Sequence, residues 1–185
     1  MMIQGYIRLA IIIIVIISVL YLPILFVLKK KGKGFTRQLS YLLCFLAFFF
    51  IVFATIILFN IPIDFSPEEH FLNLIPFGRF GEEVNVLNTI TDEIMPNIMI
   101  FIPLGVFIPI AFEKMRKLYK TAFIVFLVTF SVEFFQYFIG RKSDIDDIMT
   151  NLLGGIIGYG IFKVLNYLFK DKKWWNKFMG KDLTI

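Results

Sequence analysis

RKSDIDDIMTNLLGGIIG, residues 141–158, crowds three carboxylates into a short charged turn and then runs without a break into an apolar, glycine-rich stretch. Just upstream, Glu133 and Gln136 lie within another apolar run, residues 121–139. Two neighbouring hydrophobic segments therefore carry ionisable and amide side chains close to where they meet, at a depth within the membrane. Burying such groups there costs free energy. That cost indicates a specific role for these polar side chains.

The whole chain has the composition of an integral membrane protein. Of its 185 residues, 58% are hydrophobic and 24 are Phe, and its mean hydropathy is +0.80. The apolar residues form blocks close to the ~20 residues that a helix needs to cross ~30 Å of hydrocarbon. No block alternates like a barrel strand. The sequence therefore predicts an all-α, polytopic helix bundle with about five spans, at residues 7–28, 39–60, 94–112, 121–139 and 148–169.

Several functional classes are disfavoured by the residue counts. The chain has one Cys and one His, which excludes an intramolecular disulfide and argues against a His-based zinc site or a Ser-His-Asp triad. The net charge of +5 comes mostly from Lys and Arg beside apolar blocks, as topology signals and contact with lipid headgroups would require. Membrane lipids, not nucleic acid, are the expected partners.

Lys and Arg also predict the orientation, because they concentrate in residues 29–37, 114–120 and 163–181. Cytoplasmic loops are rich in these residues, so we expect the N-terminus outside and the C-terminus in the cytoplasm. The first block has no cleavage site after it and is expected to be a retained span rather than a signal peptide. The connection 61–93 is long and partly apolar, which predicts a re-entrant or interfacial outer loop with a short helix over residues 82–92. We expect a single domain, residues 1–185.

Glu133 is the first candidate functional residue. It lies twelve residues into its predicted span, which is about 18 Å at ~1.5 Å per residue, and Gln136 follows it on the same face. A carboxyl at that depth must be neutral, paired with a cation or hydrated, and Arg141 is the nearest cation from the same end. For Gln136 a simple interhelical hydrogen bond, worth ~0.6 kcal/mol, is an equally good explanation.

The last predicted span carries a polar stripe that continues into glycines. Asp144, Asp147 and Asn151 are spaced i, i+3, i+7, and Gly154-x-x-x-Gly158 extends the same face if the helix begins about Ser143 or Asp144. Ser143 or Asp144 is a natural N-cap and carboxylates favour a first helical turn, so one Asp can be purely structural. The glycines predict close helix packing that brings Asn151 toward Glu133.

The third predicted span opens with Asn97, another polar group of the outer leaflet, and contains Pro103. Proline lacks an N–H and would kink a membrane helix, freeing carbonyls for a neighbour, water or a cation. A kink that only shapes the helix is an equally good explanation.

These outer residues in combination resemble the VanZ-like family of bacterial membrane proteins. The matching elements cover about half of the chain: Asn73 to Phe77, Asn97 with Phe101-x-Pro103-x-Gly105, Glu133-x-x-Gln136, and Arg141-x-x-Asp144-x-Asp146-Asp147-x-x-x-Asn151-x-x-Gly154 with Gly158. The resemblance implies a multi-pass protein of the bacterial cell membrane, and the family's named member lowers susceptibility to the glycopeptide teicoplanin. It also adds Asn73 and Asp146 to the candidate site residues.

Three functions remain open for this site. In an enzyme acting on a lipid-linked or cell-envelope substrate, Glu133 would be general acid or base, Arg141 an anion clamp, and Asp144 and Asp147 orienting groups. Substrate-binding candidates are Asn73, Asn97, Gln136, Asp146 and Asn151. Alternatively, the same groove binds a lipid or cell-wall fragment without turnover. A third possibility is a site for a hard cation such as Ca²⁺ or Mg²⁺.

Overall fold

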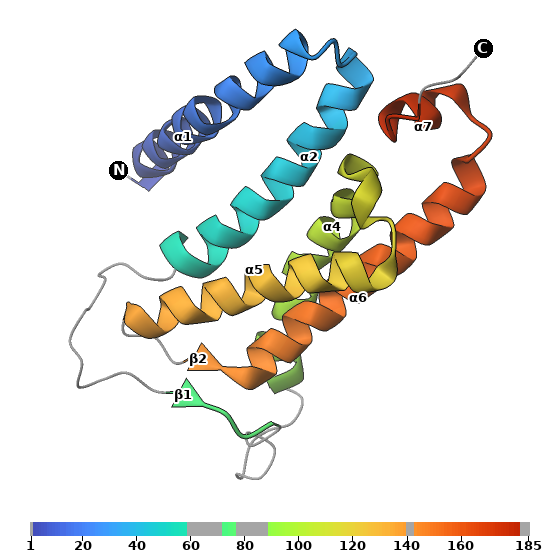
Figure 1. The fold of residues 1–185 in the computed structure, drawn as a ribbon. Coiled ribbons are helices and arrows are strands. Elements are labelled where there is room, and N and C mark those ends of the chain that lie inside the picture. Colours follow the sequence, from blue (N-terminus) through green and yellow to red (C-terminus); the bar gives the residue numbers. More distant parts are fainter. Residues whose placement is uncertain (1, 59–71, 77–88, 140–142, 182–185) are drawn as a thin grey trace.

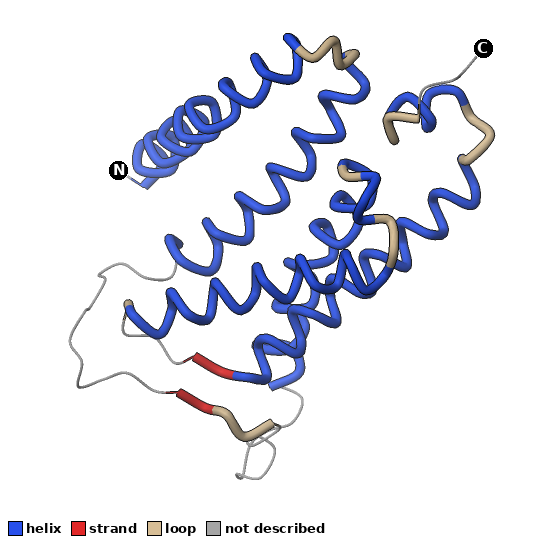
Figure 2. Tube along the Cα trace, viewed as in Figure 1, coloured by secondary structure: helices blue, strands red, loops and turns tan. Residues whose placement is uncertain are grey.

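The computed structural model describes residues 2–58, 72–76, 89–139 and 143–181, and this part of the chain is mostly helical, with one short strand pair (Figures 1 and 2). The prediction of an all-α membrane helix bundle is confirmed. The α-helices are α1 (Met2–Lys30), α2 (Phe35–Val52), α4 (Met95–Ala111), α5 (Leu118–Phe138), α6 (Ile145–Phe169) and α7 (Lys173–Phe178).

Four helical segments in the described part are long and apolar enough to cross a membrane: Phe35–Ile56, Ile90–Ala111, Leu118–Phe138 and Ile145–Phe169. Together with α1, which has 29 residues and covers the first predicted span, they agree with the expectation of about five spans. Each of the four begins three or four residues before its predicted start. The helices begin in the polar residues that precede each apolar block, because backbone hydrogen bonding does not require apolar side chains. The prediction placed each start at the first residue of the apolar block.

The helix α4 lies in the middle of the bundle. The helix α6 packs along it, α2 lies against α4 and α5 against α6, while α1 sits at the periphery beside α2 (Figure 1). Phe101 and Val125, both fully buried, mark the centre of one core cluster. A second cluster contains Trp175, which is 3% exposed, whereas Trp174 is 51% exposed. Only Trp174 is therefore available for a role at the membrane–water interface, where tryptophan beside lysines is common.

Glycines bring α4 and α6 into backbone contact. A Cβ atom at Gly154 would collide with the carbonyl oxygen of Ile98, and one at Gly158 with that of Ile102. Gly105 of α4 meets the backbone of Gly155 in the same way. The close packing predicted from the small-residue spacing is confirmed, and it fixes the height of α6 relative to α4.

The two ends of the bundle differ in chemistry. At one end, here called the acidic end, β1 (Leu72–Asn73) pairs in parallel with β2 (Ser143–Asp144), so the connection between α2 and α4 meets the start of α6. Two π-helical segments, η1 (Phe53–Leu58) and η4 (Ile90–Ile94), occur in the helices that connect to that loop. Most of the predicted 61–93 loop, with residues 82–88 of its expected helix, lies outside the described residues.

The opposite end, here called the basic end, joins the α1–α2 turn, the 3-10 segment η5 (Glu113–Met115) and α7. Arg37 of α2 donates hydrogen bonds to the carbonyl oxygens of Ile110, at the end of α4, and Phe178, at the end of α7. The segments that the lysine pattern predicts on the cytoplasmic side therefore share one end of the molecule. Which side of the membrane that end faces stays a prediction.

Candidate functional site

Glu133 joins α5 to the start of α6 at the acidic end. Its side chain is 3% exposed, and its Oε2 accepts a hydrogen bond from the backbone N–H of Asp144 at 3.0 Å. A carboxylate bound by a backbone donor at a helix start satisfies a group that would otherwise have no partner in the membrane. The geometry gives Glu133 a definite structural partner, one that spacing along the sequence could not identify.

Asp144 is the N-cap of α6 and the point where three segments meet. Its Oδ1 accepts from the backbone N–H of Asp146 at 3.0 Å, and Nδ2 of Asn73 lies 3.2 and 3.1 Å from its two carboxylate oxygens. Asp144 is only 1% exposed. The predicted capping role is confirmed, and the pairing of β1 with β2 explains why Asn73 reaches it.

A second polar pair connects α4 with α6. Nδ2 of Asn97 donates to Oδ1 of Asp147 at 2.9 Å, and both side chains are half-buried. Asp147 is one turn past the capping Asp144, so its carboxylate lies in the first turn, where the helix dipole favours negative charge. Asp146, also half-buried, belongs to the same turn. These two carboxylates are more accessible than Glu133 and Asp144.

Asn151 lies one layer deeper and is 3% exposed. Its Nδ2 donates to Oγ1 of Thr129 at 2.9 Å, whereas its Oδ1 is buried without a partner among the described residues. Thr129 precedes Glu133 by one helical turn on α5, so Asn151 contacts α5 one turn away from Glu133 rather than Glu133 itself. Thr129 itself was not a sequence candidate.

Gln136 points to a different neighbour. Its Nε2 donates to the backbone carbonyl of Thr55 in η1 at 3.1 Å, which ties α5 to the π-helical end of the second span. This is the simple interhelical hydrogen bond that the sequence left open. A π-helical segment shifts the backbone register and is frequent at functional sites.

Two further predictions concern ions. Arg141, the expected anion clamp, lies outside the described residues. Within the described part of the chain, no group of three or more His, Cys, Asp or Glu side chains is arranged to hold a metal ion. The hard-cation hypothesis therefore gains no support from the geometry of the three aspartates.

An apolar groove lies between the second span and α5. It has a volume of about 290 Å³, and its lining includes Ile56, Val132 and Phe135. Val132 and Phe135 are sequence neighbours of Glu133 and Gln136. The lining of the groove itself contains none of the acidic-end side chains described above.

The fold and this arrangement define the class of protein: a polytopic α-helical membrane protein whose buried polar side chains gather where the strand β1 of the long 61–93 connection meets the start of the last span. The chain belongs to the VanZ/LLP1 family, whose model matches residues 39–166. It is 32% identical over 147 residues to "Protein VanZ" of Enterococcus faecium, covering 77% of this chain and 82% of that protein. No solved structure matches it significantly. The family match contains every candidate site residue and leaves α1 and α7 outside.

Proposed function

We propose that this protein acts at the outer face of the bacterial cell membrane, on or with a lipid-linked component of the cell envelope. Lowered susceptibility to glycopeptides such as teicoplanin would be a cellular consequence. The observation that carries the proposal is the buried Glu133, whose carboxylate accepts a hydrogen bond from the backbone N–H of Asp144 at the start of α6. Polar side chains at membrane depth are costly and usually serve function.

The groove supports a lipid-linked substrate in particular. It is lined by aliphatic and aromatic side chains, with Ser131 as the one hydroxyl. A prenyl or acyl chain fits such a surface. Membership in the VanZ/LLP1 family is consistent with a role in the envelope.

The roles proposed for the side chains follow from their exposure. Asp147 and Asp146 are half-buried and can contact a headgroup, with Asn97 orienting Asp147. Glu133 and Asp144 are almost fully buried and shape the start of α6, and Glu133 is the candidate general acid or base if a reaction occurs. Arg141 is proposed to bind a phosphate of the substrate.

The test compares cells that express the protein or its variants in a strain lacking the gene. We expect Asp147→Asn and Glu133→Gln to lose any change in envelope lipids, muropeptides or teicoplanin susceptibility while the variants still accumulate in the membrane. Asp171→Asn and Glu113→Gln make the same chemical changes at exposed positions near the basic end. Full retention of the phenotype by Asp147→Asn and Glu133→Gln would refute the proposal.

Binding without turnover is the second candidate, and the apolar groove favours it because a groove can retain a lipid without a reactive group. Purified protein incubated with an envelope lipid extract separates the two. Chemically altered lipid after incubation supports an enzyme. Lipid that is enriched on the protein and unmodified supports a binding or shielding protein.

A further inference from the structure

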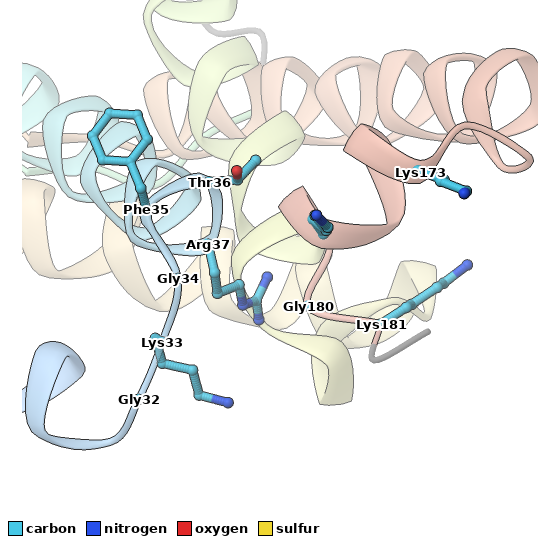
Figure 3. Close-up of a pocket in the computed structure, with 10 residues that line it drawn as sticks. Gly32, Lys33, Gly34, Phe35, Thr36, Arg37, Lys173, Gly180 and Lys181 are labelled. Atoms are coloured by element: carbon cyan, nitrogen blue, oxygen red, sulfur yellow. The ribbon is translucent and has the colours of Figure 1, made fainter. Parts of the chain in front are cut away.

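A large pocket opens at the basic end, between the α1–α2 turn and α7 (Figure 3). Its volume is about 940 Å³. The side chains that line it include five cations and no carboxylate among the described residues, the cations being Lys33, Arg37, Lys173, Lys177 and Lys181. They come from two segments more than 130 residues apart in the sequence, so the pocket is a product of the fold and not of a single run of lysines.

Arg37 holds the walls of this pocket together. It is 9% exposed, and its guanidinium donates to the carbonyl oxygens of Ile110 at 2.9 Å, Ala111 at 2.6 Å and Phe178 at 3.0 Å. Cations favour helix C-terminal carbonyls, which here belong to α4 and α7. The hydrogen bonds fix α7 against α2 and α4, so the lysines of α7 stay opposite the α1–α2 turn.

Gly180 allows the closest approach of the two walls. Its φ is +66°, and a Cβ atom there would lie 2.5 Å from Nε of Arg37. Both the backbone conformation and the space therefore favour glycine at this position. The contact indicates a built pocket, because the chain after α7 is shaped to fit the Arg37 side chain.

The charge of the pocket requires a counterion. Like charges gathered without an acid repel one another, and an anion placed among them reduces that cost. Lys33, Lys173, Lys177 and Lys181 are exposed and can turn toward such an anion, whereas Arg37 is already engaged by carbonyl oxygens.

We propose that this pocket binds the headgroup of an anionic phospholipid. The phosphate would lie among the lysines, and the acyl chains would leave past Phe35, which lines the pocket and is 81% exposed. Trp174, 51% exposed beside Lys173, suits the same membrane–water boundary. An apolar rim next to the cations favours a lipid over a soluble phosphate, because a free ion gains nothing from it.

The test uses the purified full-length protein in neutral detergent micelles and a short-chain, tail-labelled phosphatidylglycerol, with binding followed by fluorescence anisotropy. A triple variant, Lys33→Gln, Lys177→Gln and Lys181→Gln, is compared with a control triple, Lys114→Gln, Lys117→Gln and Lys170→Gln. The control removes the same charge near the same end without touching the pocket. We expect about fivefold weaker binding per pocket lysine and about a hundredfold for three, which corresponds to ~1 kcal/mol per basic residue near anionic lipid.

Equal loss in the control triple would overturn the proposal, because it would show charge attraction without a site. Equally tight binding of labelled phosphatidylcholine would overturn it as well, since that lipid has no net charge. Full competition by inorganic phosphate at millimolar concentration would assign the pocket to a soluble anion instead. If the triple variant is not monodisperse, the single variants Lys33→Gln and Lys177→Gln are used, and unchanged binding in both refutes the site.

Discussion

Replacing Thr129 by Val tests how α5 and α6 hold Asn151. The amide of Asn151 donates to the Thr129 hydroxyl at 2.9 Å, and the two residues are 3% and 0% exposed. Valine keeps the shape of threonine and removes the acceptor. The amide group is then buried without a partner, so we expect Thr129→Val to destabilise the bundle although the packed volume is unchanged.

The loss of stability in Thr129→Val depends on whether the Asn151 side chain keeps any other hydrogen bond. Hydrogen bonds between membrane helices contribute ~0.6 kcal/mol on average, whereas a buried polar group without a partner costs ~1–3 kcal/mol. Oδ1 of Asn151 already has no partner among the described residues. We therefore expect Thr129→Val alone to cost about 1–2 kcal/mol. In the Asn151→Leu background the same change should cost almost nothing, because no amide is left to satisfy.

The wild type, the two single variants and the double variant form a double-mutant cycle. Reversible unfolding in mixed micelles, followed by circular dichroism, measures the stability of all four proteins. Ser131→Ala removes an exposed hydroxyl from the same helix and is the matched control, with no expected change. Equal costs for Thr129→Val in both backgrounds would refute the reasoning. The cycle also bears on function. An Asn151→Leu variant that keeps its stability and loses the cellular phenotype would point to a ligand at Oδ1.

Three further predictions concern the packing at each end. Gly158→Ala forces a methyl group onto the Ile102 carbonyl and should lower the free energy of unfolding by ~1–3 kcal/mol in the same assay. Gly160→Ala, which has open space around it, should leave the free energy of unfolding unchanged. Equal effects of the two variants would contradict the close α4–α6 contact. Arg37→Met removes charged hydrogen bonds worth ~1.5–3 kcal/mol each, so α7 should become accessible to trypsin. Lys31→Met is the control and should leave α7 protected. If α7 stays protected in Arg37→Met as well, Arg37 does not hold it in place. Asn73→Ala should speed hydrogen exchange in residues 72–76, since it removes the side-chain bonds to Asp144, and unchanged exchange would mean that the strand pair alone holds this segment.

The helices and the polar face of α6 could be predicted from the sequence, because both follow from local periodicity. Block length gives the spans, and helical spacing places Asp147 and Asn151 on one face of α6, whereas Asp144, predicted on the same face, is the extended N-cap before the helix. The tertiary partners could not be predicted in this way. Thr129 looks like any threonine in an apolar block, and only packing against Asn151 reveals its role.

Arg37 illustrates a different limit. As one of several cations after the first span, it is indistinguishable by pattern from residues that only set topology. In the structure it is buried, and it connects α2 to α4 and α7 through carbonyl oxygens of those two helices. Asn73 likewise reaches Asp144 only because a two-residue parallel pairing joins segments about 70 positions apart, and such short pairings leave no periodic signal.

The glycine face and the polar cluster depend on each other, and this governs how variants should be interpreted. Because Gly154 and Gly158 contact backbone atoms of α4, they set the height of α6, and that height aligns Asp147 with Asn97 and Asn151 with Thr129. A methyl group at either glycine would displace all of these pairs together. Loss of function in a glycine variant would therefore not implicate the glycine in chemistry. Only polar variants that keep the glycine contacts, such as Asp147→Asn, can separate the positioning of the site from its action on a substrate.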